Sequence, residues 1–162
     1  MIRSDDIIPP QSFPVIRRAT SADISAIAEI ESKVFIDPWE PSVFLEALMY
    51  YPTTYFVAVC ESRIAGFAVG ALEDTGENIY GHICNFAVSP HYQHRGIGTA
   101  LMRRVEQQFA LESATGAQLE VRESNHRAQK FYSRLGYRPV FQIGEYYANG
   151  EHALVMMKWF RF

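Results

Sequence analysis

The sequence predicts an α/β fold in which one mixed β-sheet is flanked by helices. Segments rich in Val, Ile, Phe and Ala alternate with segments whose apolar residues recur every three or four positions, which is the spacing of an amphipathic helix. No internal repeat or low-complexity tract interrupts this alternation. The chain has 162 residues, of which 48% are apolar and 20% are charged, and this suits a single domain with a buried core.

The predicted elements follow the order strand, two helices, three strands, helix, strand, helix and two strands. β-Branched and aromatic residues mark the strands, and glycine, asparagine and proline mark the turns. Residues 1–13 are expected to form a loose N-terminal arm, because their prolines oppose regular structure, and the domain is expected over residues 14–162. The strands are expected at about residues 15–19, 55–60, 64–72, 79–88, 118–122, 137–147 and 152–160.

Capping and breaking residues delimit the first three helices. Thr20 and Asp23 resemble a capping box in front of an apolar helical stripe. Pro38 and Pro41 end that helix and separate it from a short second one. Gly116 is expected to close the third helix, because glycine commonly takes the position after a helix end.

The fifth predicted strand and the helix after it carry polar residues in a regular pattern. Glu120 lies in the middle of the strand, on the face opposite to its two apolar neighbours. Ser124 or Asn125 can cap the following helix, and Gly136 stands in its stop position. The last two strands flank a turn signal at residues 149–150.

Charge and cysteine content narrow the class of function. The net charge of -3 offers no basic surface for nucleic acid, and no apolar run reaches the roughly 18 residues that cross a bilayer. The N-terminus lacks the basic-then-apolar order of a signal peptide, so a soluble cytoplasmic protein without a membrane partner is expected. Cys60 and Cys84 are expected to be small buried residues of a reducing compartment. The sequence does not indicate an oligomeric state.

Gly96 and Gly98 form the strongest local motif, in a loop between a predicted strand and a predicted helix. Two closely spaced glycines allow a tight turn whose N–H groups, at a helix N-terminus, can bind a phosphate. The motif lacks the Lys of a Walker loop, and Leu101 replaces the third glycine of a dinucleotide fingerprint. Taken alone, it fits a structural turn about as well as a binding loop.

Two longer segments make the motif specific. Residues 88–102, VSPHYQHRGIGTALM, resemble the acetyl-CoA-binding motif of the GNAT N-acetyltransferase superfamily, with its core Gln/Arg-x-x-Gly-x-Gly/Ala. Residues 119–125, LEVRESN, and the aromatic positions up to Tyr137 resemble the second motif of the same superfamily. The likeness covers about residues 15–158. It is strongest to the ribosomal-protein alanine N-acetyltransferases and the archaeal Nα-acetyltransferases, which also have a similar Phe/Pro-Trp loop, Asn-x-Ala-Val strand and paired-tyrosine hairpin.

The resemblance implies a GNAT-like, mostly antiparallel sheet that splays at its fourth and fifth strands, with the pantetheine arm of acetyl-CoA in the gap. It assigns Glu120 as the general base, acting through water, and Tyr132 as the acid that protonates the CoA sulfur. The acetyl-CoA site would comprise Phe86, Ala87, Val88, Gln93, His94, Arg95, Gly96, Ile97, Gly98, Thr99 and Asn125. The substrate site would comprise Phe35, Trp39, Asn85, Tyr146 and Tyr147.

Physical chemistry adds conditions to these roles. A protein α-amine has a pKa of about 8 and is partly neutral near pH 7, whereas a lysine near 10.4 is almost wholly charged, so a modest base suffices for an N-terminus. Glu120 needs partial burial to act as that base, since an ordinary glutamate has a pKa of about 4.3. The oxyanion is expected on a strand N–H near Phe86 or Val88.

Structural roles compete with the functional ones at most of these positions. Glu120 can be an ordinary strand carboxylate, Tyr132 a core residue, and Phe35 with Trp39 a staple of the helix corner. The tyrosine pair can pack across strands, in which case only one of the two faces the core. His91 and His94 have a zinc-like spacing but no third ligand nearby, so no metal is expected.

Other positions bear on the substrate. The clusters Arg103–Arg104 and Arg122–Arg127 are expected to lie on solvated faces, the alternative being that one arginine steers the phosphates of CoA. Two residues depart from the relatives' pattern: His152 replaces an Asp of the hairpin, and Glu40 replaces the Ser of the Pro-Trp-Ser loop. Glu40 would favour a basic or unprotected amine.

The favoured function is acetylation of a protein N-terminus, a ribosomal protein being one candidate. Three alternatives share the same features: acetylation of a small amine, a non-catalytic acyl-CoA sensor, and a nucleotide-binding module. The missing Lys after the glycines counts against the last.

Overall fold

The computed structural model describes residues 13–161, so nearly all of the predicted N-terminal arm lies outside the described residues. One seven-stranded sheet has the order β1-β2-β3-β4-β5-β7-β6, and all its neighbouring pairs are antiparallel except the parallel pair β4–β5. The strands are β1 Val15–Arg18, β2 Tyr55–Cys60, β3 Arg63–Asp74, β4 Ile79–Val88, β5 Gly116–Arg122, β6 Arg138–Ile143 and β7 Ala153–Trp159. The predicted α/β fold with a mixed, mostly antiparallel sheet is confirmed.

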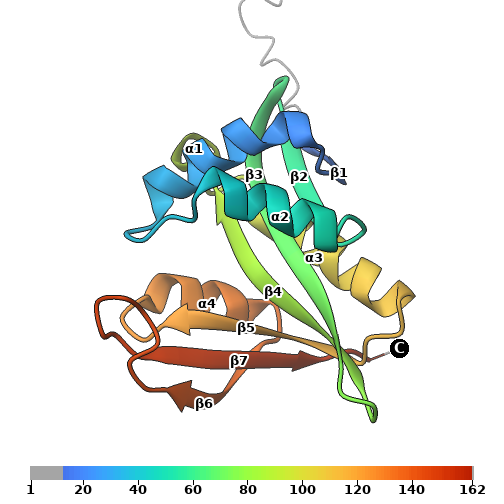
Figure 1. Cartoon of the computed structure of the whole chain (residues 1–162), viewed down its shortest axis with the longest axis vertical. Helices are drawn as coiled ribbons and strands as arrows, with labels where there is room; N and C mark the ends of the chain where they lie inside the picture. The colour runs from blue at the N-terminus through green and yellow to red at the C-terminus, as the bar shows by residue number, and fades with distance from the viewer. Residues whose placement is uncertain (1–12, 162) are drawn as a thin grey trace, which may run out of the picture.

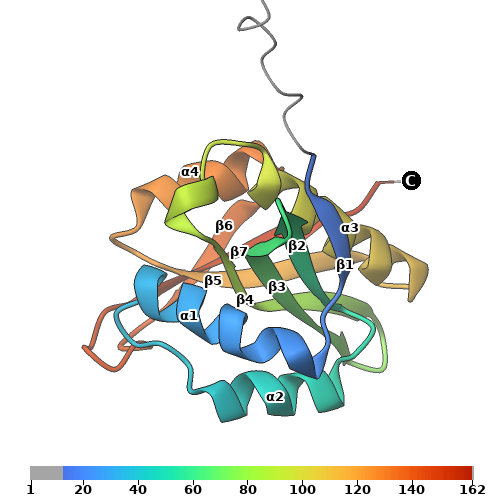
Figure 2. The same cartoon turned by 90° about the horizontal axis from the view of Figure 1, so that it is seen from above.

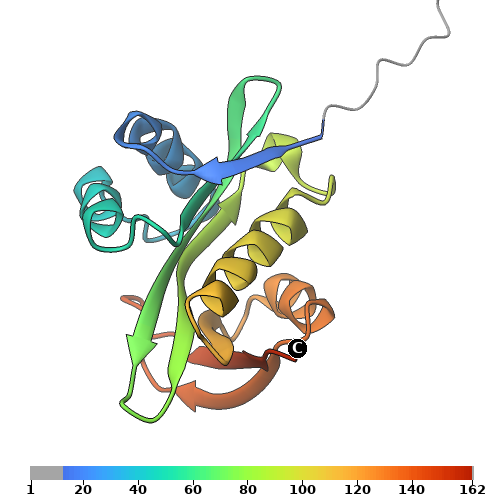
Figure 3. The ribbon, with the colours of Figure 1, turned by 90° about the vertical axis from the view of Figure 1, so that its right-hand side faces the viewer.

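Helices cover both faces of this sheet. The helices α1 (Ile24–Val34) and α2 (Pro41–Tyr50) lie on one face, and α3 (Ile97–Leu111) and α4 (His126–Arg134) lie on the other (Figures 1 and 3). In the view from above, β4 runs through the middle of the molecule between the two helical layers (Figure 2). No helix in residues 13–161 is long and apolar enough to span a membrane.

Successive residues of a strand point to opposite faces of the sheet, so they pack alternately into two hydrophobic clusters. Phe56 packs with α3 residues such as Leu101 and Phe109, whereas its neighbours Tyr55 and Val57 pack with α1 and α2. All five side chains are at least 99% buried. The sheet is therefore fixed on both faces, which gives the site a rigid support.

The capping predictions are confirmed for the helices α1 and α4. Thr20 and Asp23 form the capping box before α1, and Arg17 holds the Asp23 carboxylate at 2.7 Å. Asn125 caps α4 by accepting a hydrogen bond from the Ala128 N–H at 3.1 Å.

The prediction that Gly116 closes the third helix was wrong. The helix α3 ends at Leu111, the turn after it contains Ser113 at φ 72°, and Gly116 is the first residue of β5. A Cβ atom at Gly116 would lie 2.5 Å from the Lys158 carbonyl oxygen of the neighbouring strand β7. Glycine is needed there for the close approach of two strands.

The predicted strand over residues 137–147 is also too long. The strand β6 ends at Ile143, and both Tyr146 and Tyr147 lie in the connection to β7. The alternation of a regular strand therefore does not decide which tyrosine faces the core. The turn signal at residues 149–150 is confirmed, with Gly150 at φ 85°.

The parallel pair β4–β5 is the point at which the sheet opens. Pairing runs only from Gly81 opposite Ala117 to Ile83 opposite Leu119. Beyond these residues β4 continues to Val88 beside β3, and β5 continues to Arg122 beside β7. The two strands thus separate where the sequence predicts a splay.

Candidate active site

The loop between β4 and α3 has the geometry of a phosphate-binding turn. Gly96 caps α3 with φ 77°, a left-handed conformation that glycine adopts without strain, and space is open around its Cα. A Cβ atom at Gly98 would lie 3.2 Å from both Phe86 and Phe131, whose rings stack at 5.7 Å. The first glycine therefore permits the turn, and the second permits close packing of the helix. The free N–H groups of the first turn of α3 are suited to an anion.

Basic side chains surround this turn. Arg127 of α4 donates to Gln93 at 3.2 Å and to the ring nitrogen Nε2 of His94 at 2.7 Å. Arg95 is exposed and lies over the Tyr92 ring. These cations make the electrostatic potential around the turn more positive, which favours a pyrophosphate.

Among the other residues predicted to bind the cofactor, Ile97 has a buried side chain, so only its backbone can contact a ligand.

The predicted pantetheine edge is formed by Phe86, Ala87 and Val88 at the open side of β4. Their other edge pairs with β3, and no strand within residues 13–161 pairs with the side that faces the gap. The Phe86 N–H donates to the side-chain oxygen of Asn85 at 2.9 Å. An acetyl oxygen that used the Phe86 N–H would therefore replace this contact.

Glu120 lies where β4 and β5 separate, and its partner is a residue that sequence reasoning missed. The carboxylate oxygen Oε2 is 2.7 Å from Nε2 of His82, and only 13% of the Glu120 side chain is exposed. Oε1 makes no hydrogen bond with any residue in the described part of the chain, so it remains able to accept one. Glu120 is partly buried, which is the condition that its predicted role sets.

The other side of the His82 ring faces two further acidic groups. Its Nδ1 atom lies 3.8 Å from the Cys84 sulfur and 3.7 Å from the Glu73 carboxylate. Burial opposes protonation of His82, but the hydrogen bonds and charges of Cys84 and Glu120 outweigh it and raise the pKa of His82 to about 10. At neutral pH the imidazole is therefore a cation that holds and orients Glu120.

Tyr132 is packed beside the same gap by α4. The centroid of its ring lies 6.3 Å from the ring centroid of Phe86, 5.3 Å from that of Phe131 and 6.0 Å from that of Tyr137. Burial, with a smaller contribution from Tyr147, raises the pKa of Tyr132 well above its ordinary value, so the hydroxyl stays protonated. This hydroxyl makes no hydrogen bond with a residue in the range 13–161. Tyr132 is thus a core aromatic whose hydroxyl can donate a hydrogen bond and has no acceptor among the described residues.

Glu31 organises the opposite side of the gap and was also missed. It is 2% exposed and accepts hydrogen bonds from the Asn85 side chain at 2.9 Å and the Trp39 N–H at 3.3 Å. Burial raises the pKa of this carboxyl. Phe35 and Trp39 both pack on the core, which supports the staple interpretation, and Trp39 also lines a cavity.

Arg122 connects two loops across β5, and the prediction of a solvated face was wrong for it. Its side chain is 16% exposed and bridges Asp37 at 3.2 Å and Glu151 at 3.0 Å. Its guanidinium lies 4.0 Å from the Tyr147 ring, and that ring meets Tyr146 edge-on at 5.0 Å. The α1–α2 loop and the β6–β7 loop are thereby joined beside Glu120.

The remaining predicted positions have simpler surroundings. Asn125 accepts its capping hydrogen bond through Oδ1, which leaves the side-chain NH2 group to donate to a cofactor. His152 accepts a hydrogen bond from the Glu145 N–H at 2.9 Å and so anchors the hairpin. Within residues 13–161, no three His, Cys, Asp or Glu side chains are grouped as a metal site.

Comparisons with known proteins agree with this geometry. Residues 24–137 match the acetyltransferase (GNAT) family. An uncharacterized N-acetyltransferase of Methanocaldococcus jannaschii is 37% identical over 145 residues, covering 89% of this chain and 90% of that protein. An N-alpha-acetyltransferase of Sulfurisphaera tokodaii is 31% identical over 150 residues, covering 87% and 90%.

A solved structure extends the similarity to the fold. The crystal structure of Ard1 from Thermoplasma volcanium is 23% identical and superposes with a TM-score of 0.87, covering 92% of this chain and 99% of that one. The matched family segment includes the glycine turn, the splay and the helix that carries Tyr132. The chain therefore belongs to the GNAT acetyltransferase family and is an N-acetyltransferase of that family.

Proposed function

We propose that this enzyme transfers the acetyl group of acetyl-CoA to the α-amine of a peptide or protein N-terminus. The observation that carries the proposal is the His82–Glu120 pair, at 2.7 Å, where β4 and β5 separate. His82 is on β4, the strand that leads into the glycine loop, and Glu120 is on β5 two residues from Arg122, which joins the two loops. The name of the Sulfurisphaera tokodaii relative, an N-alpha-acetyltransferase, supports the same acceptor.

The residues suit two parts of the cofactor, its pyrophosphate and its pantetheine arm. The open turn at Gly96 and the start of α3 would hold the pyrophosphate, with Arg95 and Arg127 nearby. The unpaired edge of β4 from Phe86 to Val88 would hold the pantetheine arm as a neighbouring strand does. Acetyl-CoA supplies the activated acetyl group as a thioester.

Glu120 would accept the proton that the amine loses. A peptide α-amine with a pKa of about 8 is partly neutral near pH 7, so the carboxylate need only take a proton during attack, directly or through water. Oε2 is held by the His82 cation, and Oε1 is left to receive the proton. His82 thus acts as a positioning residue for the base.

Tyr132 would supply the proton that the departing sulfur needs. Its hydroxyl is protonated, faces no internal acceptor among the described residues and is held beside Phe86 at the edge of the gap. A tyrosine is a weaker acid than a thiol, so the donation relies on close placement at the sulfur. The base and the acid thereby lie on different secondary-structure elements around one opening.

The test uses mass spectrometry of peptides incubated with the enzyme and acetyl-CoA. One set has a free Ala or Ser N-terminus and no lysine, and includes a ribosomal-protein N-terminus; the other is N-blocked and has an internal lysine. Acetylation of the free α-amine alone, lost in Glu120→Gln, is the expected result. Modification of the internal lysine, or of a polyamine but no peptide, would reject the proposal.

A further inference from the structure

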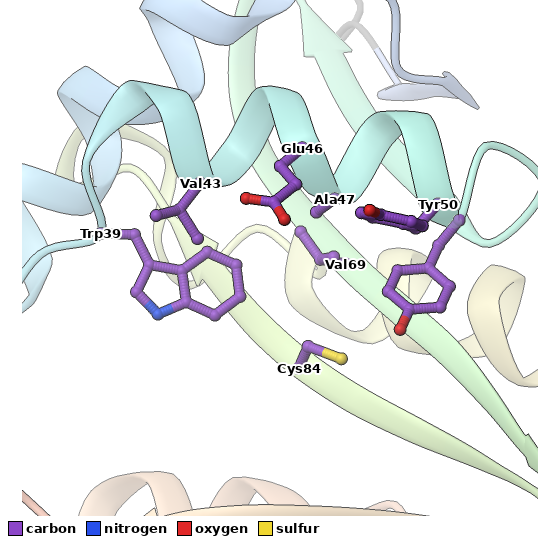
Figure 4. A pocket seen from close by; sticks show the side chains of 8 residues that line it. Trp39, Val43, Glu46, Ala47, Tyr50, Val69 and Cys84 are labelled. Carbon is purple, nitrogen blue, oxygen red and sulfur yellow. The ribbon is translucent and has the colours of Figure 1, made fainter.

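A cavity of about 440 Å³ lies beside the proposed reaction centre, between α2 and the strands β3 and β4 (Figure 4). Trp39, Tyr50 and Tyr51 form aromatic walls. Val69 and Cys84 form its base on the sheet. Apart from Cys84, which contacts His82, none of these residues contacts the groups that transfer protons above, and the cavity is open to solvent.

The walls of the cavity are apolar side chains that remain accessible. The rings of Tyr50 and Tyr51 are 6.3 Å apart and are 70% and 38% exposed. Trp39 is held in place by Phe44, at a ring distance of 5.2 Å, and by its backbone bond to Glu31. Such faces suit the aliphatic part of a long side chain and can also attract a cation.

Glu46 is the charged residue among those that line the cavity. Figure 4 shows its carboxylate over the cavity, between Trp39 and Tyr50. Glu46 is exposed, and it forms no ion pair or hydrogen bond with another residue in the described range 13–161. A carboxylate beside aromatic faces, with no cation of its own, is complementary to a long basic side chain.

The cavity and the reaction centre share one residue. The Cys84 sulfur, at the base of the cavity, lies 3.8 Å from Nδ1 of His82, and Nε2 of the same ring lies 2.7 Å from Glu120. A peptide whose α-amine reaches Glu120 therefore has its first residues next to the cavity.

We infer that this cavity binds a lysine or arginine side chain close to the N-terminus of the substrate. The inference rests on the proposed function and narrows its substrate class to peptides with a basic residue near the acetylated end. The stem of the side chain lies against Trp39 and the tyrosines, and its charge lies near Glu46. An acidic residue at the same position is repelled.

The experiment compares peptides that differ at one position, scanned over the second to fourth residues, with Lys, norleucine or Glu. Norleucine keeps the aliphatic stem of lysine and lacks the charge. At the peptide position whose side chain enters the cavity, we expect kcat/KM to be about fivefold higher for Lys than for norleucine. The difference should arise mainly from a lower KM, and its size is that of an exposed ion pair with a cation–π contact. In the Glu46→Gln variant, kcat/KM for the Lys peptide should fall to the value for the norleucine peptide. In the Glu46→Lys variant, the Glu peptide should have the highest kcat/KM of the three. Glu29→Gln, the same change on the neighbouring helix α1, leaves the order unchanged.

The possible failures are distinct. Equal rates for Lys and norleucine at every position, or a Lys preference that persists in Glu46→Gln, would overturn the inference while peptide acetylation stands. If no peptide is acetylated whatever its sequence, the proposed function and the inference fail together. High salt should lower the ratio of kcat/KM for the Lys peptide to that for the norleucine peptide, because it screens the contact with Glu46, whereas its effect on cofactor binding is common to both peptides.

Discussion

The proposed cofactor side and the proposed acceptor side of the site are built in different ways. The cofactor side comes mainly from one continuous segment, the end of β4, the glycine turn and the start of α3, and it relies mainly on backbone groups, to which α4 adds Asn125 and Arg127. The acceptor side is assembled from side chains far apart in the sequence, such as Asp37 with Arg122 and Glu31 with Asn85. A local motif can specify the first region, whereas only the folded sheet brings the second together.

The largest expected effect falls where the two regions meet. Glu120→Gln keeps the shape of the side chain and removes the base, so kcat/KM should fall about a hundredfold or more, in the range of general acid–base contributions. Cofactor affinity should change little, whereas the melting temperature near pH 7 should fall, because His82 loses its charged partner. Glu123→Gln, three residues further along and exposed, is the control. Near-normal rates in Glu120→Gln would remove this residue from the mechanism.

The cofactor side alone should respond to Gly96→Val. The φ of 77° is unfavourable for a branched residue, and the side chain would enter the open space expected to hold phosphate. KM for acetyl-CoA should rise about tenfold, as for loss of a contact worth about 1.4 kcal/mol. Gly76→Val is a matched control, since Gly76 has φ 85° in open space on the β3–β4 turn. Equal effects of both variants on KM would mean that only backbone strain is measured.

The acceptor side alone should respond to Arg122→Gln. The variant loses the ion pairs to Asp37 and Glu151 and leaves two loops unconnected. KM for the peptide should rise severalfold, on the order of 1 kcal/mol, with KM for acetyl-CoA unchanged. Steady-state kinetics with each substrate varied in turn separates the two effects. A rise confined to the acetyl-CoA KM would contradict the division of the site into two regions.

The smallest effect is a change in the pH dependence of stability. The pKa of His82 is raised from 6.5 to about 10 in the folded protein, so its stabilising contribution is complete below pH 6.5 and is lost as the pH rises toward 10. His82→Gln should therefore flatten the fall in melting temperature across that interval. His126→Gln is the control, because His126 is exposed at the start of α4. If the melting temperatures of wild type and His82→Gln change with pH in parallel, the His82–Glu120 pair is not charged.

The order of elements and the glycine turn could be predicted because their signals are local. A capping box at Thr20 and Asp23, a period of two in β5 and a helix after Gly96 are each specified by a few neighbouring residues. Gly116 misled the prediction because a glycine after a helix and a glycine beneath a neighbouring strand look alike in sequence. The nearby Lys158 carbonyl, which distinguishes them, belongs to a strand more than 40 residues away.

His82 and Glu31 could not be predicted from local patterns. The relation of His82 to Glu120 depends on the register of β4 against β5, which places His82 opposite Gln118. Glu31 looks like a surface residue of an amphipathic helix until Asn85 and the Trp39 N–H are brought to it. In both cases the informative contact joins segments that a sequence motif does not cover.

The most direct test of the account is the affinity of a conjugate in which a peptide α-amine is joined to CoA through the acetyl carbon. If the two regions meet at Glu120, the conjugate should bind more tightly than CoA or peptide alone, and Gly96→Val and Arg122→Gln should each weaken it. A conjugate that binds no better than CoA, or that is insensitive to Arg122→Gln, would contradict the claim that both regions serve one acetyl transfer.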